Sequence, residues 1–194
     1  MYLWGLRVMM VVGLSLLVAT GEAGAAKDNQ YQNGEVGLSL SKPDDWVFMT
    51  PEDIGLAAGS DAIPDGMLIA LARHPEPYPA LNATVQVMHG QLPYEGVEPE
   101  EVLSDIVRSM RMSSPVYEEP EPIHPERVSG HPAAAVRFVT RSTGTGSSPR
   151  VLSRMWVVVR GVELFIIDMN GPAEGPDLSE AEFSDIFRSL RIKG

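Results

Sequence analysis

Hydrophobic and polar residues alternate in short blocks along much of the chain, which is the pattern of strands buried on one face. Residues 36–41, 46–50, 67–73 and 84–91 form such blocks, and clusters of Pro, Gly and Asp separate them. Residues 116–128 are also extended, but their prolines remove hydrogen-bond donors from the backbone, so this segment is expected to be an edge strand at most.

The most apolar segments come late in the chain. Residues 133–141 predict one strand, and residues 151–159 and 162–169 predict two more with the runs WVVV and LFII. Consecutive apolar residues are typical of a strand that is covered on both faces. Arg160-Gly161 predicts the tight turn between the last two strands. Some other element must therefore cover each face of the sheet.

Two amphipathic helices are the candidates for these covers. The chain contains SDIVRSMRM from Ser104 and the similar SDIFRSLRI from Ser184. Each has apolar residues at the i, i+3, i+4, i+7 spacing of a helix that packs on one face. The first helix is expected between Pro99 and Pro115, and the second from Ser179. The repeat therefore predicts one structural element used twice, rather than a duplicated active site.

These elements predict one α+β domain over residues 36–194, in which the two helices are the candidates to cover the strong strands. Residues 27–35 are polar and are expected to be an N-terminal segment ahead of the domain.

Residues 1–26 have the features of a signal peptide. Arg7 precedes an apolar run of 12 residues, and Ala23–Ala25 has the small-x-small pattern of a cleavage site. The run is shorter than the ~20 residues of a spanning helix. Cleavage near Ala25 or Ala26 would release a periplasmic or secreted domain with no stable membrane anchoring. The alternative is an uncleaved N-terminal anchor.

The composition of the chain excludes some types of chemistry and disfavours one class of ligand. The chain has no cysteine, which excludes disulfides, thiol nucleophiles and lipid-modified cysteine. Its net charge of −11 disfavours binding to nucleic acid.

Known catalytic and metal-binding motifs give no positive signal. Ser39-Leu40-Ser41-Lys42 matches S-x-x-K, but that chemistry needs a helix, and here the segment alternates like a strand before Pro43. The four histidines lack metal-site spacing, and only His124 lies among several glutamates. The sequence therefore predicts no metal, no cofactor and no catalytic residue.

Arginines form the constellation that most needs an explanation. If the hairpin around residues 142–149 is symmetric, Arg141 lies opposite Arg150 and Arg137 lies opposite Arg154, all on one face. Like charges that face each other destabilise a strand pair. Either the acidic stretch Glu118–Glu126 neutralises them, or the face docks a carboxylate, a phosphate or an acidic partner protein.

The order of the elements resembles PsbP-like domains, including exported bacterial proteins of the DcrB type. The similar residues are Tyr31, Gly37–Leu40, Pro43–Trp46 and Ser129–Ala133, together with the last two strong strands and the C-terminal amphipathic helix. The resemblance spans residues 31–192 and implies an antiparallel sheet between helices. It also implies a role in binding proteins and supplies no catalytic residue.

The expected function is therefore a non-catalytic, protein-binding or accessory domain of the bacterial cell envelope, with another envelope protein as its partner. The alternative is a periplasmic binder of a small molecule or anion. That binder would use the arginine face or a pocket beneath the loop Pro51–Gly66.

Overall fold

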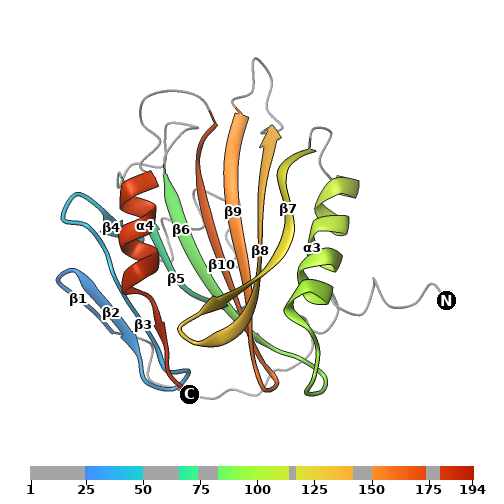
Figure 1. The fold of residues 1–194 in the computed structure, drawn as a ribbon. Coiled ribbons are helices and arrows are strands. Elements are labelled where there is room, and N and C mark those ends of the chain that lie inside the picture. Colours follow the sequence, from blue (N-terminus) through green and yellow to red (C-terminus); the bar gives the residue numbers. More distant parts are fainter. Residues whose placement is uncertain (1–24, 50–65, 74–82, 114–116, 142–149, 174–179) are drawn as a thin grey trace.

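A computed structural model describes residues 25–49, 66–73, 83–113, 117–141, 150–173 and 180–194, and these residues form two sheets and two helices (Figure 1). The first sheet contains β1 (Ala25–Lys27), β2 (Gln30–Asn33), β3 (Leu38–Ser41) and β11 (Arg191–Ile192). The second contains β4 (Val47–Phe48), β5 (Met67–Ala72), β6 (Thr84–Gln91), β7 (Tyr117–Val128), β8 (His131–Arg141), β9 (Arg150–Arg160) and β10 (Glu163–Pro172). The helices are α3 (Pro99–Ser113) and α4 (Glu180–Ser189).

The larger sheet is antiparallel and has the strand order β4-β5-β6-β10-β9-β8-β7. The two most apolar strands, β9 and β10, lie in its interior, as their continuous hydrophobic runs predict. The proline-rich β7 is an edge strand whose pairing with β8 is interrupted twice by register shifts. Because prolines cannot donate to a further strand, they also protect this edge from pairing with other chains.

The turn between β9 and β10 lies one residue later than predicted. Arg160 pairs with Glu163, so Gly161 and Val162 form the turn. Gly161 has a φ of 63°, which is a left-handed conformation that glycine adopts without a steric penalty.

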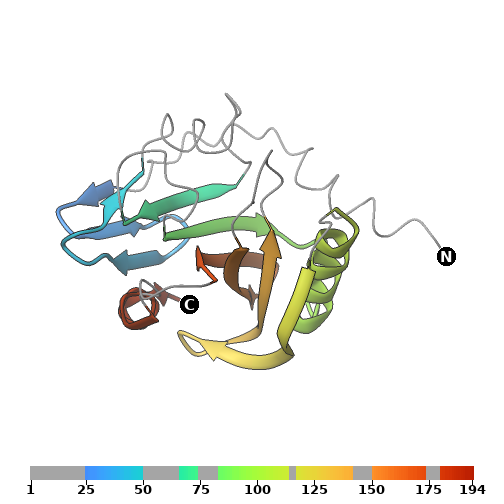
Figure 2. The ribbon, with the colours of Figure 1, turned by 90° about the horizontal axis from the view of Figure 1, so that it is seen from above.

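The two helices cover opposite faces of the central strands, as the sequence predicts (Figure 2). Helix α3 packs on β7, β8 and β9, with Leu103 fully buried in a core that includes Phe138 and Val157. Helix α4 lies on the other face, where Ile186 is buried in the larger core with Phe165 and Ile167. The double coverage explains why β9 and β10 are apolar on both sides.

The N-terminal segment is a correction to the sequence analysis. Residues 27–35 do not precede the domain, because β2 lies within this segment and pairs with β3. Tyr31 is buried and donates a hydrogen bond to the carbonyl of Leu68 at 3.0 Å, which links the two sheets. Asn33 is also buried and accepts from the backbone amide of Glu35 at 3.1 Å. Polar residues that serve the fold concealed this strand in the sequence, whereas β1 and β11 are only 3 and 2 residues long.

The tip of the β7–β8 hairpin holds the C-terminal segment in place. Ser129 Oγ donates to the carbonyl of Leu190 at 3.2 Å and accepts from the amide of Ile192 at 3.1 Å. The ring nitrogen Nε2 of His131 lies 3.1 Å from the carbonyl oxygen of Ile192. The Ser-Gly-His-Pro-Ala turn therefore has a structural function.

Several predictions fall on residues that the structure does not describe: most of the predicted signal peptide, the loop Pro51–Gly66 apart from Gly66, and the start of the second helix at Ser179. Strand β1 begins at Ala25, so a cleavage near Ala25 or Ala26 would shorten this strand. Neither α3 nor α4, the helices in the described ranges, has the length and hydropathy needed to cross a membrane.

Candidate functional site

The four predicted arginines have the predicted strand register. Arg137 of β8 pairs with Arg154 of β9, and Arg141 pairs with Arg150. Because side chains alternate along a strand, all four residues occupy positions on the face that α4 covers further along the sheet. The structure thus brings the arginine positions together, which the alternation and the length of the loop predict correctly.

The acidic edge strand supplies partners to part of this cluster. Arg137 Nη1 donates to Glu121 Oε1 at 3.0 Å, and Arg150 Nη2 donates to Glu118 Oε2 at 2.5 Å. The two glutamate side chains are 48% and 55% exposed, so solvent screens both pairs. The face is therefore a zone of mixed charge at the β7 edge. The structure describes the backbone of Arg141 but not its side chain.

Arg154 lines a cleft of about 50 Å³ between α4 and the sheet. The other lining residues are Trp156, Met169, Phe183, Ser184 and Phe187. The rings of Trp156 and Phe187 lie 4.5 Å apart, and Trp156 Nε1 donates to Glu126 at 2.8 Å. A guanidinium group beside aromatic rings suits a planar carboxylate, although the cleft has room only for a small group.

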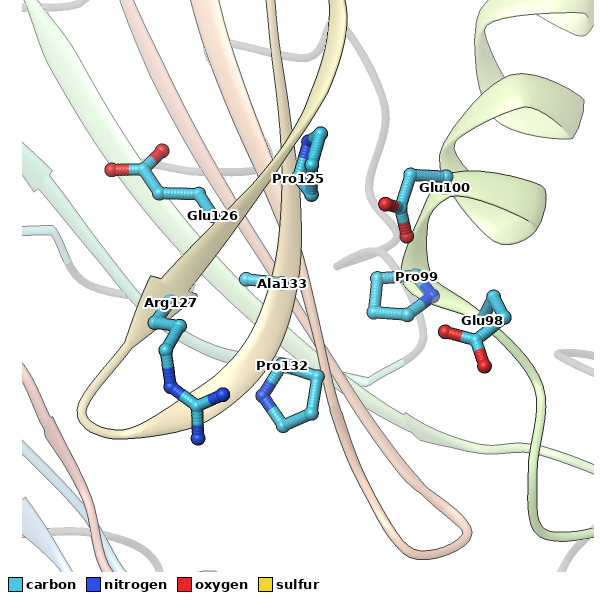
Figure 3. A pocket seen from close by; sticks show the side chains of 8 residues that line it. All are labelled: Glu98, Pro99, Glu100, Pro125, Glu126, Arg127, Pro132 and Ala133. Atoms are coloured by element: carbon cyan, nitrogen blue, oxygen red, sulfur yellow. The ribbon is translucent and has the colours of Figure 1, made fainter.

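A larger open pocket of about 370 Å³ lies between the start of α3 and the β7–β8 hairpin (Figure 3). Prolines from three segments form part of its walls, and Glu98 and Glu100 line it from the helix. Carboxylates in the first turn also stabilise the positive end of a helix, which accounts for their presence without a ligand. The sequence analysis missed this pocket, since its lining comes from segments that meet only in the fold.

Asp168 was also missed, because it lies within the apolar strand β10. Asn170 Nδ2 donates to Asp168 Oδ2 at 2.9 Å, and Ser153 Oγ donates to Asn170 Oδ1 at 2.5 Å. Burial raises the pKa of the Asp168 carboxyl to about 6, and the hydrogen bond from Asn170 opposes this shift. The chain of donors from Ser153 through Asn170 thus ends on a buried carboxyl group.

The residues of the other candidate motifs make hydrogen bonds or close contacts within the fold. Ser39 lies in strand β3, as predicted, and Lys42 Nζ donates to Asn29 Oδ1 at 2.8 Å. The ring nitrogen Nδ1 of His124 lies 3.0 Å from the carbonyl oxygen of Pro122. Within the described ranges, no three His, Asp or Glu residues are grouped so as to hold a metal ion.

Solved structures with a similar fold place the chain in a structural class. Cyanobacterial PsbP (CyanoP) from Synechocystis sp. PCC 6803 matches with a TM-score of 0.54 and 12% identity, over 93% of this chain and 99% of that chain. The Ran-binding protein Mog1p from Saccharomyces cerevisiae matches with a TM-score of 0.52 and 10% identity, over 87% and 96%. LpqN, described as involved in cell envelope biogenesis of Mycobacterium tuberculosis, matches with a TM-score of 0.52 and 15% identity, over 81% and 83%.

The class is therefore the PsbP/Mog1-like α+β fold, with an antiparallel sheet between helices, as the resemblance in sequence implies. The chain spans 46% of the length of a matched structure from Bacteroides thetaiotaomicron, for which the TM-score is 0.48. No family model and no curated protein matches the sequence.

Proposed function

We propose that this protein is an exported, non-catalytic accessory domain of the bacterial cell envelope that binds another envelope protein. The observation that carries the proposal is the zone of mixed charge at the β7 edge, where the arginine positions of β8 and β9 lie beside exposed glutamates. Charged rims of this kind steer a partner and set its orientation.

Three further features support this proposal. The N-terminal sequence has the pattern of a signal peptide, which would direct the domain out of the cytoplasm. Two proteins with a similar fold have related descriptions: Mog1p is described as a Ran-binding protein, and LpqN as involved in cell envelope biogenesis. None of the three matched proteins named above is described by a reaction.

Affinity capture from native envelope extract tests the binding surface. The full-length chain, with a tag after Gly194, is compared with the double variant R137Q/R154Q, which removes two central charges from the face. The matched control R108Q/R188Q removes two arginines that are 68% and 75% exposed on the helices, where each pairs with an aspartate of its own helix. A protein captured in stoichiometric amount by the wild type and the control, and lost with R137Q/R154Q, is the expected result.

Capture that survives R137Q/R154Q would overturn the assignment of the surface, provided that circular dichroism shows the variant to be folded. Export has its own test. The mature chain in the periplasmic fraction should lack 25 or 26 N-terminal residues by mass, whereas an unprocessed chain in the membrane fraction would favour the anchor.

Anion binding is the second candidate, and the cleft beside Arg154 favours it. A rise in melting temperature with acetate or phosphate that the R154Q substitution abolishes would support it. The absence of any response to either anion would exclude both as ligands.

A further inference from the structure

The open pocket between the start of α3 and the β7–β8 hairpin has two different walls (Figure 3). Pro125 and Pro132 line it from adjacent strands of the hairpin, and both residues are exposed. Glu98, Pro99 and Glu100 line it from the start of the helix. Its volume of about 370 Å³ is within the range of roughly 300–1,000 Å³ that is typical of ligand pockets. The pocket is therefore large enough for a long side chain of another protein.

The proline rings make the walls apolar and rigid. Because a proline ring fixes the backbone φ angle and leaves no N–H group, Pro99, Pro125 and Pro132 offer carbon surface but no backbone donor. Pro132 pairs with Arg127, and Pro125 pairs with Ala134, so the ladder between β7 and β8 holds the two hairpin prolines in place. A ligand that packs here does not have to order the walls first, which makes binding more favourable.

The carboxylates on the helix wall have no cation beside them. Among the described residues, no Lys, Arg or His lies within ion-pair distance of Glu98 or Glu100. Arg127, which also lines the pocket, donates from Nη2 to a backbone carbonyl at the tip of the hairpin. The carboxylate of Glu126 points away from the helix in Figure 3, and its Oε2 accepts from Trp156 Nε1 at 2.8 Å. The pocket thus presents carboxylate acceptors and apolar rings to a ligand.

The end of the helix does not by itself account for this arrangement. Glu101 lies in the same first turn of α3 as Glu100, but it does not line the pocket. Stabilisation of the positive end of the helix applies to both residues. The cavity and its proline walls are separate observations, because half of the lining comes from the β7–β8 hairpin, which only the fold brings to the helix.

We propose that this pocket binds an arginine side chain of a partner protein, with the guanidinium group on Glu98 and Glu100 and the methylene stem against the proline rings. A guanidinium group is planar and only donates hydrogen bonds, so it can bind two carboxylate oxygens at once. Its methylene stem suits the carbon surface of the walls. A bare metal ion would leave these walls without a contact, and the described residues contain no cluster of three His, Asp or Glu that could hold one.

The arginine pocket is separate from the binding surface proposed above. None of the four arginines of β8 and β9 lines it, so its occupant does not have to be the partner of that surface. The pocket can therefore be tested with peptides alone.

The experiment is a titration of the ¹⁵N-labelled full-length protein with the blocked peptide acetyl-Gly-Gly-Arg-Gly-Gly-amide. The comparison probes are the same peptide with lysine or citrulline in place of arginine, and calcium chloride. Citrulline has nearly the shape of arginine but no charge. We expect saturable shifts of the backbone amide signals of Glu100, Arg127 and Ala133 with the arginine peptide, in the millimolar range because solvent screens the ion pairs. The lysine peptide should bind more weakly, and citrulline and calcium should give no response.

The proposal is overturned if the citrulline peptide or calcium chloride shifts these signals as strongly as the arginine peptide does. It is also overturned if the arginine peptide gives no saturable shift. Neither result affects the capture experiment on the mixed-charge zone, because that experiment changes only Arg137 and Arg154. Failure of the pocket and failure of the proposed function are therefore distinguishable.

Two single substitutions in α3 separate contact with the ligand from the charge of the helix end. E100Q and E101Q each remove one carboxylate from the first turn, but only Glu100 lines the pocket. E100Q should weaken the arginine peptide by about threefold, and the double variant E98Q/E100Q by about tenfold. E101Q should leave the affinity nearly unchanged, since solvent screens a charge outside the pocket. Equal affinities of E100Q and E101Q, with both variants folded by circular dichroism, would contradict the contact with Glu100.

Discussion

Helices α3 and α4 have closely similar sequences but different positions between the layers of the protein. Both form the same local ion pair, Asp105 with Arg108 at 2.8 Å and Asp185 with Arg188 at 2.9 Å. Yet Ile186 is completely buried, whereas the equivalent Ile106 is only partly buried. The local sequence thus reproduces the helix and its surface ion pair, but not the depth of its burial.

The smaller sheet accounts for this difference. Helix α4 packs on β3 of that sheet as well as on the large sheet, so it is covered on two sides. Ser189 Oγ accepts a hydrogen bond from the amide of Ser41 at 2.8 Å, which connects the helix to the small sheet. Helix α3 packs on β7, β8 and β9 of the large sheet. Two copies of a repeated motif can therefore contribute differently to the stability of the fold when a second layer encloses only one of them.

Replacement of the two isoleucines should show the largest difference between the helices. We expect Ile186→Ala to reduce the free energy of unfolding by about 3 kcal/mol, because it leaves a cavity between the two sheets. Ile106→Ala should cost about 1 kcal/mol, since this side chain is already partly in water. Urea denaturation of both variants measures the difference, and equal losses would contradict the unequal enclosure of the helices.

The next prediction compares a buried carboxyl group, that of Asp168 on β10, with the exposed one of Asp185 on α4 through the pH dependence of stability. Because the folded-state pKa of Asp168, about 6, is above its ordinary value of 3.8, the folded protein binds more protons than the unfolded chain between these values. The stability contributed by protonated Asp168 is therefore present below about pH 4 and lost as pH rises through about 6. Asp168→Asn should abolish this loss and raise the free energy of unfolding at pH 7 by about 3 kcal/mol.

Chemical denaturation of Asp168→Asn at several pH values between 4 and 8 provides this measurement. Asp185→Asn is the control, since this carboxyl group is 68% exposed and pairs with Arg188 on its own helix. The prediction is contradicted if the free energy of unfolding of the wild type rises with pH through this window and Asp168→Asn shows the same pH dependence. That result would show that the fold does not favour the neutral form of Asp168.

The smallest expected effect concerns the serines at equivalent positions of the two helices. Ser189→Ala should cost about 1 kcal/mol, because the amide of Ser41 loses its hydrogen-bond acceptor. Ser109→Ala should be neutral or slightly stabilising, since alanine has the higher helix propensity. Thermal unfolding of the two variants gives the comparison, and equal melting temperatures would mean that the link between α4 and the small sheet has no energetic weight.

The sequence predicted a large part of the fold for clear physical reasons. Periodicity identified both helices and the main strands, because burial of one face imposes a regular spacing of apolar residues. The symmetric loop placed Arg137 opposite Arg154, because alternation in a hairpin follows from its register. Strands β1, β2 and β11 were missed because they are short, and β2 also carries the polar residue Asn33, which accepts a hydrogen bond from the backbone.

The candidate sites were less predictable than the elements. The large pocket joins the start of α3 to the β7–β8 hairpin, and Asp168 occurs in a strand that otherwise reads as core. Nothing in the local sequence around Asp168 distinguishes a buried carboxyl from a surface one. Its environment depends on Gln86 and Ser153, which come from other strands.

The sequence by itself determined which segments become helix or strand and which of their faces is apolar, because these properties depend on residues a few positions apart. Tertiary structure alone decided which copy of the helix is enclosed, which arginines meet the glutamates of β7, and which carboxyl group is buried. Burial and charge pairing depend on residues far apart in the chain, and only the packing of the layers brings such residues within contact distance.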